Sequence, residues 1–219
     1  MEGKIIKPDV PYQNKILLNG QISKSVCVGG SRMATFYLKT KRFSSYEDEF
    51  HVYLPAENIK GLNLRTGCFV SVDGEIRTRN VFVGDERRLQ VSVYANKIEN
   101  LSEEFAKKDD FVRKSNNAYL GGAICKMYPL RTTPRGKTLQ EGMIAINNRE
   151  IGQSYYIPFI AWDKAASFIN RTYRISDQVS LHGRFQSREY EKKQTDGSLN
   201  TRTAYEVSVI RMDPIIKDF

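Results

Sequence analysis

The chain of 219 residues is poor in the residues that build disulfide frameworks, metal sites and catalytic centres. It contains three cysteines, two histidines and one tryptophan. Because Cys27, Cys68 and Cys125 are odd in number and widely spaced, they predict neither a disulfide framework nor a zinc site. We expect them to be reduced core residues, and we expect His51 and His182, which lie far apart in the sequence, to be structural.

The sequence also lacks the patterns of common catalytic and nucleotide-binding sites. It has no recognisable Ser/His/Asp set, no paired acids on a loop and no glycine loop that would cradle a phosphate. No apolar run approaches the length of a transmembrane helix, and no apolar signal segment follows the N-terminus. We therefore expect a cytoplasmic protein that is not an enzyme, needs no cofactor or metal and does not enter a membrane.

Positive charge, in contrast, is abundant. The chain has 34 lysines and arginines against 25 acidic residues, a net charge of +9 and a pI near 9.4. This balance favours a polyanionic partner, most simply nucleic acid. A membrane surface is a weaker alternative because no basic amphipathic helix is visible.

One stretch, SDQVSLHGRFQSREY at 176–190, illustrates the chemistry that this charge supports. Val179 and Leu181 alternate with polar residues as in a half-buried strand, and Gly183 predicts a bulge or bend. Arg184, Arg188 and Tyr190 follow at even spacing, so they share one face. A curved barrel that holds a phosphate backbone and stacks bases fits this pattern, and so does an ordinary strand with a solvated basic face.

The pattern repeats, which indicates two copies of one domain of about 100 residues. VSVDG at 70–74 matches VSLHG at 179–183 at an offset of 109 residues. Further matches occur in the same order, at an offset of 102 near the start of each copy and at 116 between VSV at 91–93 and VSV at 207–209.

Strand signals within each copy predict an all-β fold of two tandem OB barrels, five-stranded Greek-key barrels with a short helix between strands three and four. The first copy has strand patterns at 16–22, 34–40, 50–54, 67–79 and 89–94, with a helix at 56–62. The second has them at 118–126, 142–148, 154–161, 179–190 and 204–210, with a helix at 163–173 that Asp163 would cap. We divide the chain into a first domain at 1–99, a charged linker at 100–117 and a second domain at 118–219. The basic loop 131–136 and the hairpin tip 191–201, with its turn at Asp196-Gly197, are placed where OB barrels grip ligands.

The second copy resembles the bacterial single-stranded DNA-binding protein (SSB) family over about 116–210. The resemblance rests on LRTTPRG at 130–136, INNR at 146–149, the strand ending at Trp162, GRFQSREY at 183–190 and YEVSV at 205–209. The first copy resembles a diverged member through ATFYL at 34–38, KRF at 41–43 and DGEIRTR at 73–79.

This resemblance implies sequence-tolerant binding of single strands and four OB domains per functional unit, hence a homodimer of this chain. It places the base-stacking aromatics of the second copy at Tyr156, Trp162 and Tyr190. In the first copy it places them at Phe43 and Phe50. The remaining base-stacking positions of the family are occupied there by Ala56 and Val81, which are not aromatic. Asp218 and Phe219 resemble the family's acidic tail tip, but they follow the last strand without a spacer and beside Lys217.

The residues themselves leave plainer readings open. A lone tryptophan is more often core than platform, but Tyr156 and Trp162 are six residues apart and so share a strand face, with Pro158 between them predicting a bulge. Any single basic residue could serve solubility alone. The predicted phosphate contacts are Arg131, Arg135, Lys137, Arg149, Arg184, Arg188, Lys192 and Lys193 in the second copy and Arg42, Arg77 and Arg79 in the first.

These observations predict a protein that coats and protects single-stranded DNA without strong sequence preference. The setting would be replication, recombination, repair or mobile-element transfer, at the nucleoid in the cytoplasm, with replication or recombination proteins as further partners. The alternative is a primosome or recombination accessory factor whose OB domains mainly bind proteins.

Overall fold

The computed structural model describes residues 12–29, 32–42, 44, 46–84, 86–108, 111, 115–193 and 197–215, with the side chains of Lys192 and Lys193 excepted. The predicted Phe43, the turn residue Asp196 and the tail residues Asp218 and Phe219 lie outside these residues. Strands dominate the described part of the chain. None of its helices is long and apolar enough to cross a membrane.

The first barrel closes through five strands. They are β1 (Gln13–Val28), β2 (Met33–Lys41), β3 (Glu47–Pro55), β4 (Phe69–Val83) and β5 (Glu86–Leu101). β1 pairs with both β2 and β4, and β3 runs parallel to β5, so the order around the barrel is β1-β2-β3-β5-β4. A short 3₁₀ helix, η1 (Ala56–Ile59), follows β3. Strict alternation of buried and outward side chains along β2 and β3 fills the interior.

The second barrel repeats this arrangement. Its elements are β6 (Asn116–Met127), β7 (Arg131–Thr132), β8 (Thr138–Asn148), β9 (Gln153–Trp162), α3 (Asp163–Thr172), β10 (Gln178–Lys193) and β11 (Leu199–Pro214). A four-residue helix, α1 (Glu103–Ala106), capped by the Ser102 hydroxyl, lies between the barrels in the sequence. The all-β prediction and the strand order are confirmed. Asp163 is not the N-cap: it is the first residue of α3, and its carboxylate accepts a hydrogen bond from the Thr138 backbone N–H instead.

A glycine bulge bends the fourth strand of each barrel. The register slips between Asp73 and Gly74 in β4 and between His182 and Gly183 in β10. A Cβ on Gly74 would lie 2.3 Å from the Tyr94 carbonyl oxygen, and one on Gly183 would lie 2.4 Å from that of Ser208. Only glycine lets the neighbouring backbone approach this closely, so the bend predicted at Gly183 is confirmed.

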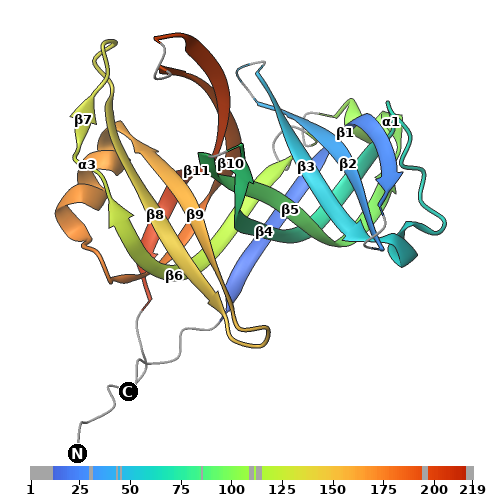
Figure 1. Ribbon diagram of the computed structural model, residues 1–219, viewed down its shortest axis with the longest axis horizontal. Helices are drawn as coiled ribbons and strands as arrows, with labels where there is room; N and C mark the ends of the chain where they lie inside the picture. The colour runs from blue at the N-terminus through green and yellow to red at the C-terminus, as the bar shows by residue number, and fades with distance from the viewer. Residues whose placement is uncertain are drawn as a thin grey trace, which may run out of the picture.

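The two barrels lie side by side and share one sheet (Figure 1). β1 and β6, which are equivalent strands, pair antiparallel from Gln13–Gly121 to Leu18–Asn116. The resulting eleven-stranded sheet runs through both barrels. The cores also meet, because the ring of Phe50 stacks on that of Phe185 with centroids 4.6 Å apart.

The strand pairings fix which residues of the two barrels are equivalent. Ile76 pairs with Val93, and its counterpart Phe185 pairs with Val207, so β5 and β11 correspond at an offset of 114 and not at the 116 of the sequence match. By the same reasoning, Val52 corresponds to Phe159, an offset of 107 for β3 and β9. The main-chain hydrogen bonds between strands, and not the short VSV match, therefore determine which residues of the two barrels correspond.

Candidate single-stranded nucleic-acid interface

The aromatic residues predicted for the second barrel lie on or near its surface. Tyr156 is 45% exposed and Tyr190 is 37% exposed, whereas Trp162 is half-buried where β9 meets α3. The pairing of β8 with β9 runs unbroken past Pro158, so the bulge predicted there is absent. Tyr156 and Trp162 therefore lie on the same outward side of β9, as a six-residue spacing requires.

Tyr190 lines a crevice between the two barrels. The crevice has a volume of about 550 Å³, and its walls come from β5 of the first barrel and from β9, β10 and β11 of the second. Arg202 crosses it and donates two hydrogen bonds to Glu86, at 2.8 and 2.6 Å. This bonding to Glu86 raises the pKa of Arg202. The crevice thus combines an exposed ring with a fixed guanidinium.

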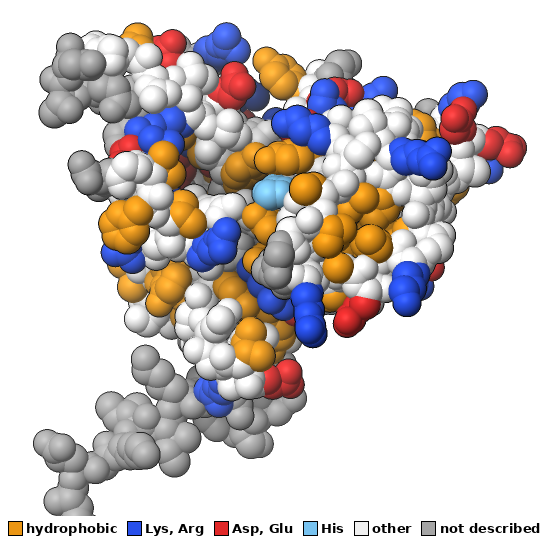
Figure 2. All heavy atoms as spheres, turned by 45° about the vertical axis from the view of Figure 1, so that its right-hand side comes forward, with side chains coloured by type: hydrophobic (Ala, Val, Ile, Leu, Met, Phe, Trp, Pro, Cys, Tyr) orange, Lys and Arg blue, Asp and Glu red, His pale blue; other side chains and the backbone are white. Residues whose placement is uncertain are grey.

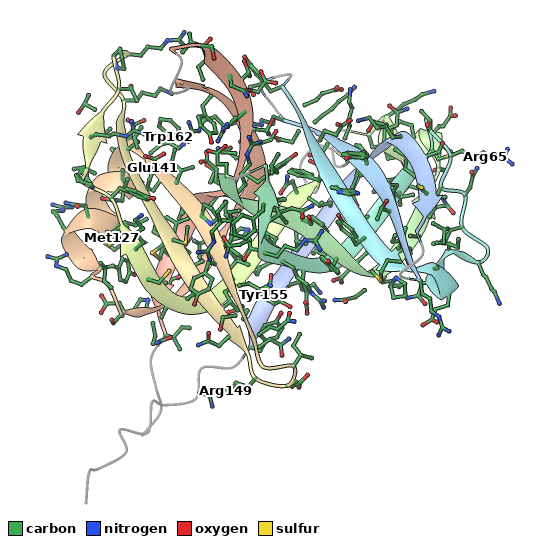
Figure 3. The ribbon with its side chains drawn as sticks, viewed as in Figure 1. Arg65, Met127, Glu141, Arg149, Tyr155 and Trp162 are labelled. Carbon is green, nitrogen blue, oxygen red and sulfur yellow. The ribbon has the colours of Figure 1, made fainter. Side chains whose placement is uncertain are left out.

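Several of the predicted cations are held by carboxylates. Glu141 accepts hydrogen bonds from Arg131, at 2.6 Å, and from Arg188, at 3.3 Å, and Arg188 also lies 3.5 Å from Glu206. Figure 3 shows Glu141 near Trp162 at one end of the second barrel. The carboxylates orient these guanidinium groups beside the aromatic face, and a phosphate would compete with them for the same donors.

The other predicted cations of the second barrel are more scattered. Arg135 and Lys137 are exposed between β7 and β8. Arg184 is half-buried, and this burial, followed by the charge of Arg42, lowers its pKa. Arg149 lies at the opposite end of the β8–β9 hairpin from Trp162 (Figure 3), about 30 Å away at about 3.3 Å per strand residue. A strand that contacts both must therefore run along the hairpin.

Two of the predictions for the first barrel are wrong. Phe50 is 1% exposed and packs against Phe185, so it cannot offer a ring face to a base. Its counterpart at the offset of 107 is the buried Ile157, and Tyr156 corresponds to Glu49. The alignment of the two copies that paired Phe50 with Tyr156 is shifted by one residue. A shift of one residue exchanges the inward and outward sides of a strand, so it assigned a buried residue of β3 to the outer side.

Arg42 is the other. Its guanidinium donates to both carboxylate oxygens of Asp48, at 2.7 and 2.5 Å, and to the Ser187 carbonyl oxygen of the second barrel at 2.7 Å. Asp48 is fully buried and also accepts from the Ser187 backbone N–H at 2.7 Å and from its hydroxyl at 3.0 Å. Hydrogen bonding to Asp48 raises the pKa of Arg42. Arg42 thus ties the two barrels together and is not an open phosphate contact.

The cysteines also differ from expectation. Cys27 is exposed, and Cys68 and Cys125 are only partly buried, so the expectation that all three are core residues is wrong. Among the residues that the structure describes, no group of three or more His, Cys, Asp or Glu side chains is arranged to hold a metal ion.

The first barrel carries an aromatic cluster that the sequence reasoning missed. Tyr37, His51, Tyr53 and Tyr94 form a row across the outer side of β2, β3 and β5, which we call the first-barrel ladder. Successive ring centroids are 4.6, 4.4 and 5.0 Å apart. All four side chains are half-buried. On the face shown in Figure 2, hydrophobic side chains gather around a histidine, with lysine and arginine side chains near them.

The remaining two first-barrel cations belong to this neighbourhood. Arg77 donates to Glu75 at 3.0 Å and lies over the Tyr94 ring, with its guanidinium carbon 4.5 Å from the centroid. Arg79 is exposed and donates to Gln90 at 2.7 Å. The structure therefore brings the cations predicted at 77 and 79 together with rings other than those predicted.

Two closed five-stranded barrels with outward aromatics and arginines define a tandem OB-fold protein of the kind that binds single strands. Residues 115–215, which span the second barrel, match the model of the single-strand binding protein family.

Solved structures show the same fold over both barrels. The wild-type single-stranded DNA binding protein from Thermus aquaticus is 20% identical, with a TM-score of 0.71 over 95% of this chain and 96% of that one. A deletion mutant of the same protein is 21% identical, with a TM-score of 0.67 over 95% and 97%. A comparison with curated proteins found no match.

Proposed function

We propose that this chain coats and protects single-stranded DNA without catalysis, in replication, recombination, repair or mobile-element transfer. The match of the second barrel to the single-strand binding protein family supports single-stranded DNA as the ligand. The observation that carries the proposal is the outward side of the second barrel. There Tyr156 and Tyr190 are exposed while Glu141 orients Arg131 and Arg188 close by.

Binding of this kind has two physical terms. Arginine and lysine neutralise phosphates and release counterions, and bases stack on aromatic rings whatever their sequence. Arg131, with its side chain 59% exposed, would exchange Glu141 for a phosphate at little cost. Exchange is cheap because a surface ion pair contributes only about 0–1 kcal/mol.

The salt dependence of binding tests the electrostatic term. Titration of Trp162 fluorescence with polythymidine should show affinity that falls steeply with salt, with a log–log slope of about −0.7 per neutralised phosphate. Duplex DNA and RNA of the same length serve as comparisons. An affinity that does not change with salt would rule out phosphate capture as the main term.

Substitution of Tyr156 tests the stacking term. Loss of one base–aromatic stack costs about 1–3 kcal/mol, so Tyr156→Ala should weaken binding of polythymidine about ten-fold. Phe168→Ala, which truncates an equally exposed ring (46%) on α3, is the matched control. Equal affinities for the two variants, with unchanged melting transitions, would show that Tyr156 is not part of the interface.

We further propose that two copies of the chain assemble to give four OB domains, and that the protein acts at the nucleoid in the cytoplasm. Light scattering should then give about twice 25.2 kDa. A mass of one chain at micromolar concentration would overturn the dimer and leave DNA binding untouched. The alternative of an accessory factor that mainly binds proteins is not favoured, because the family and the exposed second-barrel rings both support DNA as ligand.

A further inference from the structure

The first-barrel ladder is particular to the first barrel and is not a feature that the fold requires. At the equivalent positions the second barrel has Met143, Pro158, Ile160 and Ser208. The second barrel closes with the same strand pairings without these rings. The four rings therefore call for an explanation other than barrel formation.

Cations stand at both ends of the ladder. Lys24 Nζ lies 4.2 Å from the centroid of Tyr37, and the guanidinium of Arg77 lies over Tyr94 at the other end. Both cations also face acids, since Lys24 Nζ is 3.8 Å from Glu49 and Arg77 bonds to Glu75. The Lys24 side chain is 63% exposed, so the outer face of Tyr37 is covered only by a side chain that can move away.

The Arg77 end of the ladder lies against β9 of the second barrel. The guanidinium of Arg77 lies 5.9 Å from the ring of Tyr155 on β9 as well as over Tyr94. The Tyr156 backbone N–H donates to the hydroxyl of Thr78 on β4 at 2.9 Å. Tyr155 is buried, so the hydrogen bond to Thr78 is the contact that places Tyr156 next to β4. Because Thr78 follows Arg77 in β4, a strand stacked on Tyr156 has Arg77 and then the ladder beside it.

We propose that the first-barrel ladder is a second binding track for nucleobases, onto which a single strand passes from Tyr156 over Arg77. This rests on the proposed function. The faces of the inner rings stack on one another, so the strand passes along the edges of the rings, and its last base takes the place of Lys24 on the outer face of Tyr37. Lys24 then moves from the ring to a phosphate, and Arg77 binds the phosphate at the crossing between barrels. Stacking is sequence-tolerant, so the ligand is single-stranded nucleic acid of any sequence.

The experiment compares strands of two lengths. The short strand is the shortest polythymidine that quenches Trp162 in the wild-type protein, and the long strand has twice that length. We expect the double variant Tyr37→Leu/Tyr94→Leu to bind the long strand about five-fold or more weakly, since leucine keeps the apolar contact but loses the stacking face. Its affinity for the short strand should stay at the wild-type value, because that strand is filled by the second barrel.

A matched control exists within the chain. The Tyr119 ring stacks on His182 at 4.5 Å and 3°, nearly the geometry of Tyr37 on His51 at 4.6 Å and 2°. Tyr119 lies on β6, outside the proposed track, so Tyr119→Leu should bind both strands like the wild type. If the ladder variant also binds the long strand like the wild type, the ladder serves only to stabilise the sheet and the proposal fails. If no polythymidine of any length binds the wild type, it is the proposed function that fails.

Photo-crosslinking tests the track without any substitution. A long strand that carries photoreactive 5-iododeoxyuridine should crosslink to the peptide with Tyr37 or to the one with His51, as well as to second-barrel aromatics. Crosslinks confined to the second barrel would overturn the proposal even if the variants were to unfold.

Discussion

The contact between Phe50 and Phe185 should couple the stabilities of the two barrels. Both rings are 1% exposed, and they stack at 4.6 Å across the boundary between β3 and β10. Truncating a buried phenylalanine to alanine costs about 3–5 kcal/mol, so each single variant should lose that much stability. A stacked aromatic pair adds about 0.5–1.5 kcal/mol beyond its area, which is the coupling that a double-mutant cycle should reveal.

Urea unfolding followed by two signals measures this coupling. Trp162 is the only tryptophan and lies in the second barrel, so its fluorescence reports that barrel, whereas far-ultraviolet circular dichroism reports both. Phe50→Ala should lower the midpoint seen by Trp162 although the substitution is in the other barrel. Phe36→Ala, also 1% exposed but on β2 of the first barrel, is the control for simple loss of core.

Two results would refute this reasoning. If the losses of Phe50→Ala and Phe185→Ala simply add, the two rings do not interact across the boundary. If Phe50→Ala keeps full stability and weakens DNA binding, the ring is a base platform and not part of the core.

Two further predictions concern charge and protonation. Asp48→Asn leaves Arg42, whose side chain is 17% exposed, without its counter-ion. The free energy of unfolding, measured in urea, should therefore fall by about 3 kcal/mol. A fall of less than about 1 kcal/mol would show that the stability of the protein does not depend on this link between the barrels. Burial, followed by the charges of Arg79 and Lys24, lowers the pKa of His51 below its ordinary 6.5, so the unfolded chain takes up this proton first and stability should fall as the pH drops through 6.5. His51→Gln should reduce that fall in thermal unfolding measured between pH 7.5 and 5, and an identical pH profile would contradict the assignment.

Most of the architecture could be predicted because it is encoded locally. Period-two alternation identifies the strands. The internal repeat shows that the chain forms two barrels of the same kind. Gly74 and Gly183 mark the bulges because no other residue tolerates a carbonyl oxygen at such close range. The predicted strands were nonetheless too short: β5, for example, extends over Glu86–Leu101 and not over 89–94, because its ends are polar and are held by main-chain pairing with β4.

The joining of the barrels could not be predicted in the same way. β1 and β6 pair through backbone N–H and C=O groups, and every residue but proline has both. The side-chain sequence therefore does not reveal that these two strands pair. The partners of the arginines are equally hidden, because Arg42 and Ser187 are 145 residues apart. Basic residues can be counted in the sequence. Only the fold determines whether such a residue forms an ion pair with a carboxylate of the protein or is open to a phosphate.

The prediction that Phe50 is a base platform is wrong for a reason that the sequence itself contains. In β3, Phe50, Val52 and Leu54 alternate with His51 and Tyr53, and three apolar residues at even spacing belong to the core. Alternation alone therefore assigns Phe50 to the interior and leaves His51 and Tyr53 outside. An alignment of distant repeats can slip by one residue without losing many matches, whereas the pleat of a strand cannot. Where the two disagree, the alternation within the strand should decide which rings can meet a base, and in β3 it leaves His51 and Tyr53 of the proposed track on the outer side.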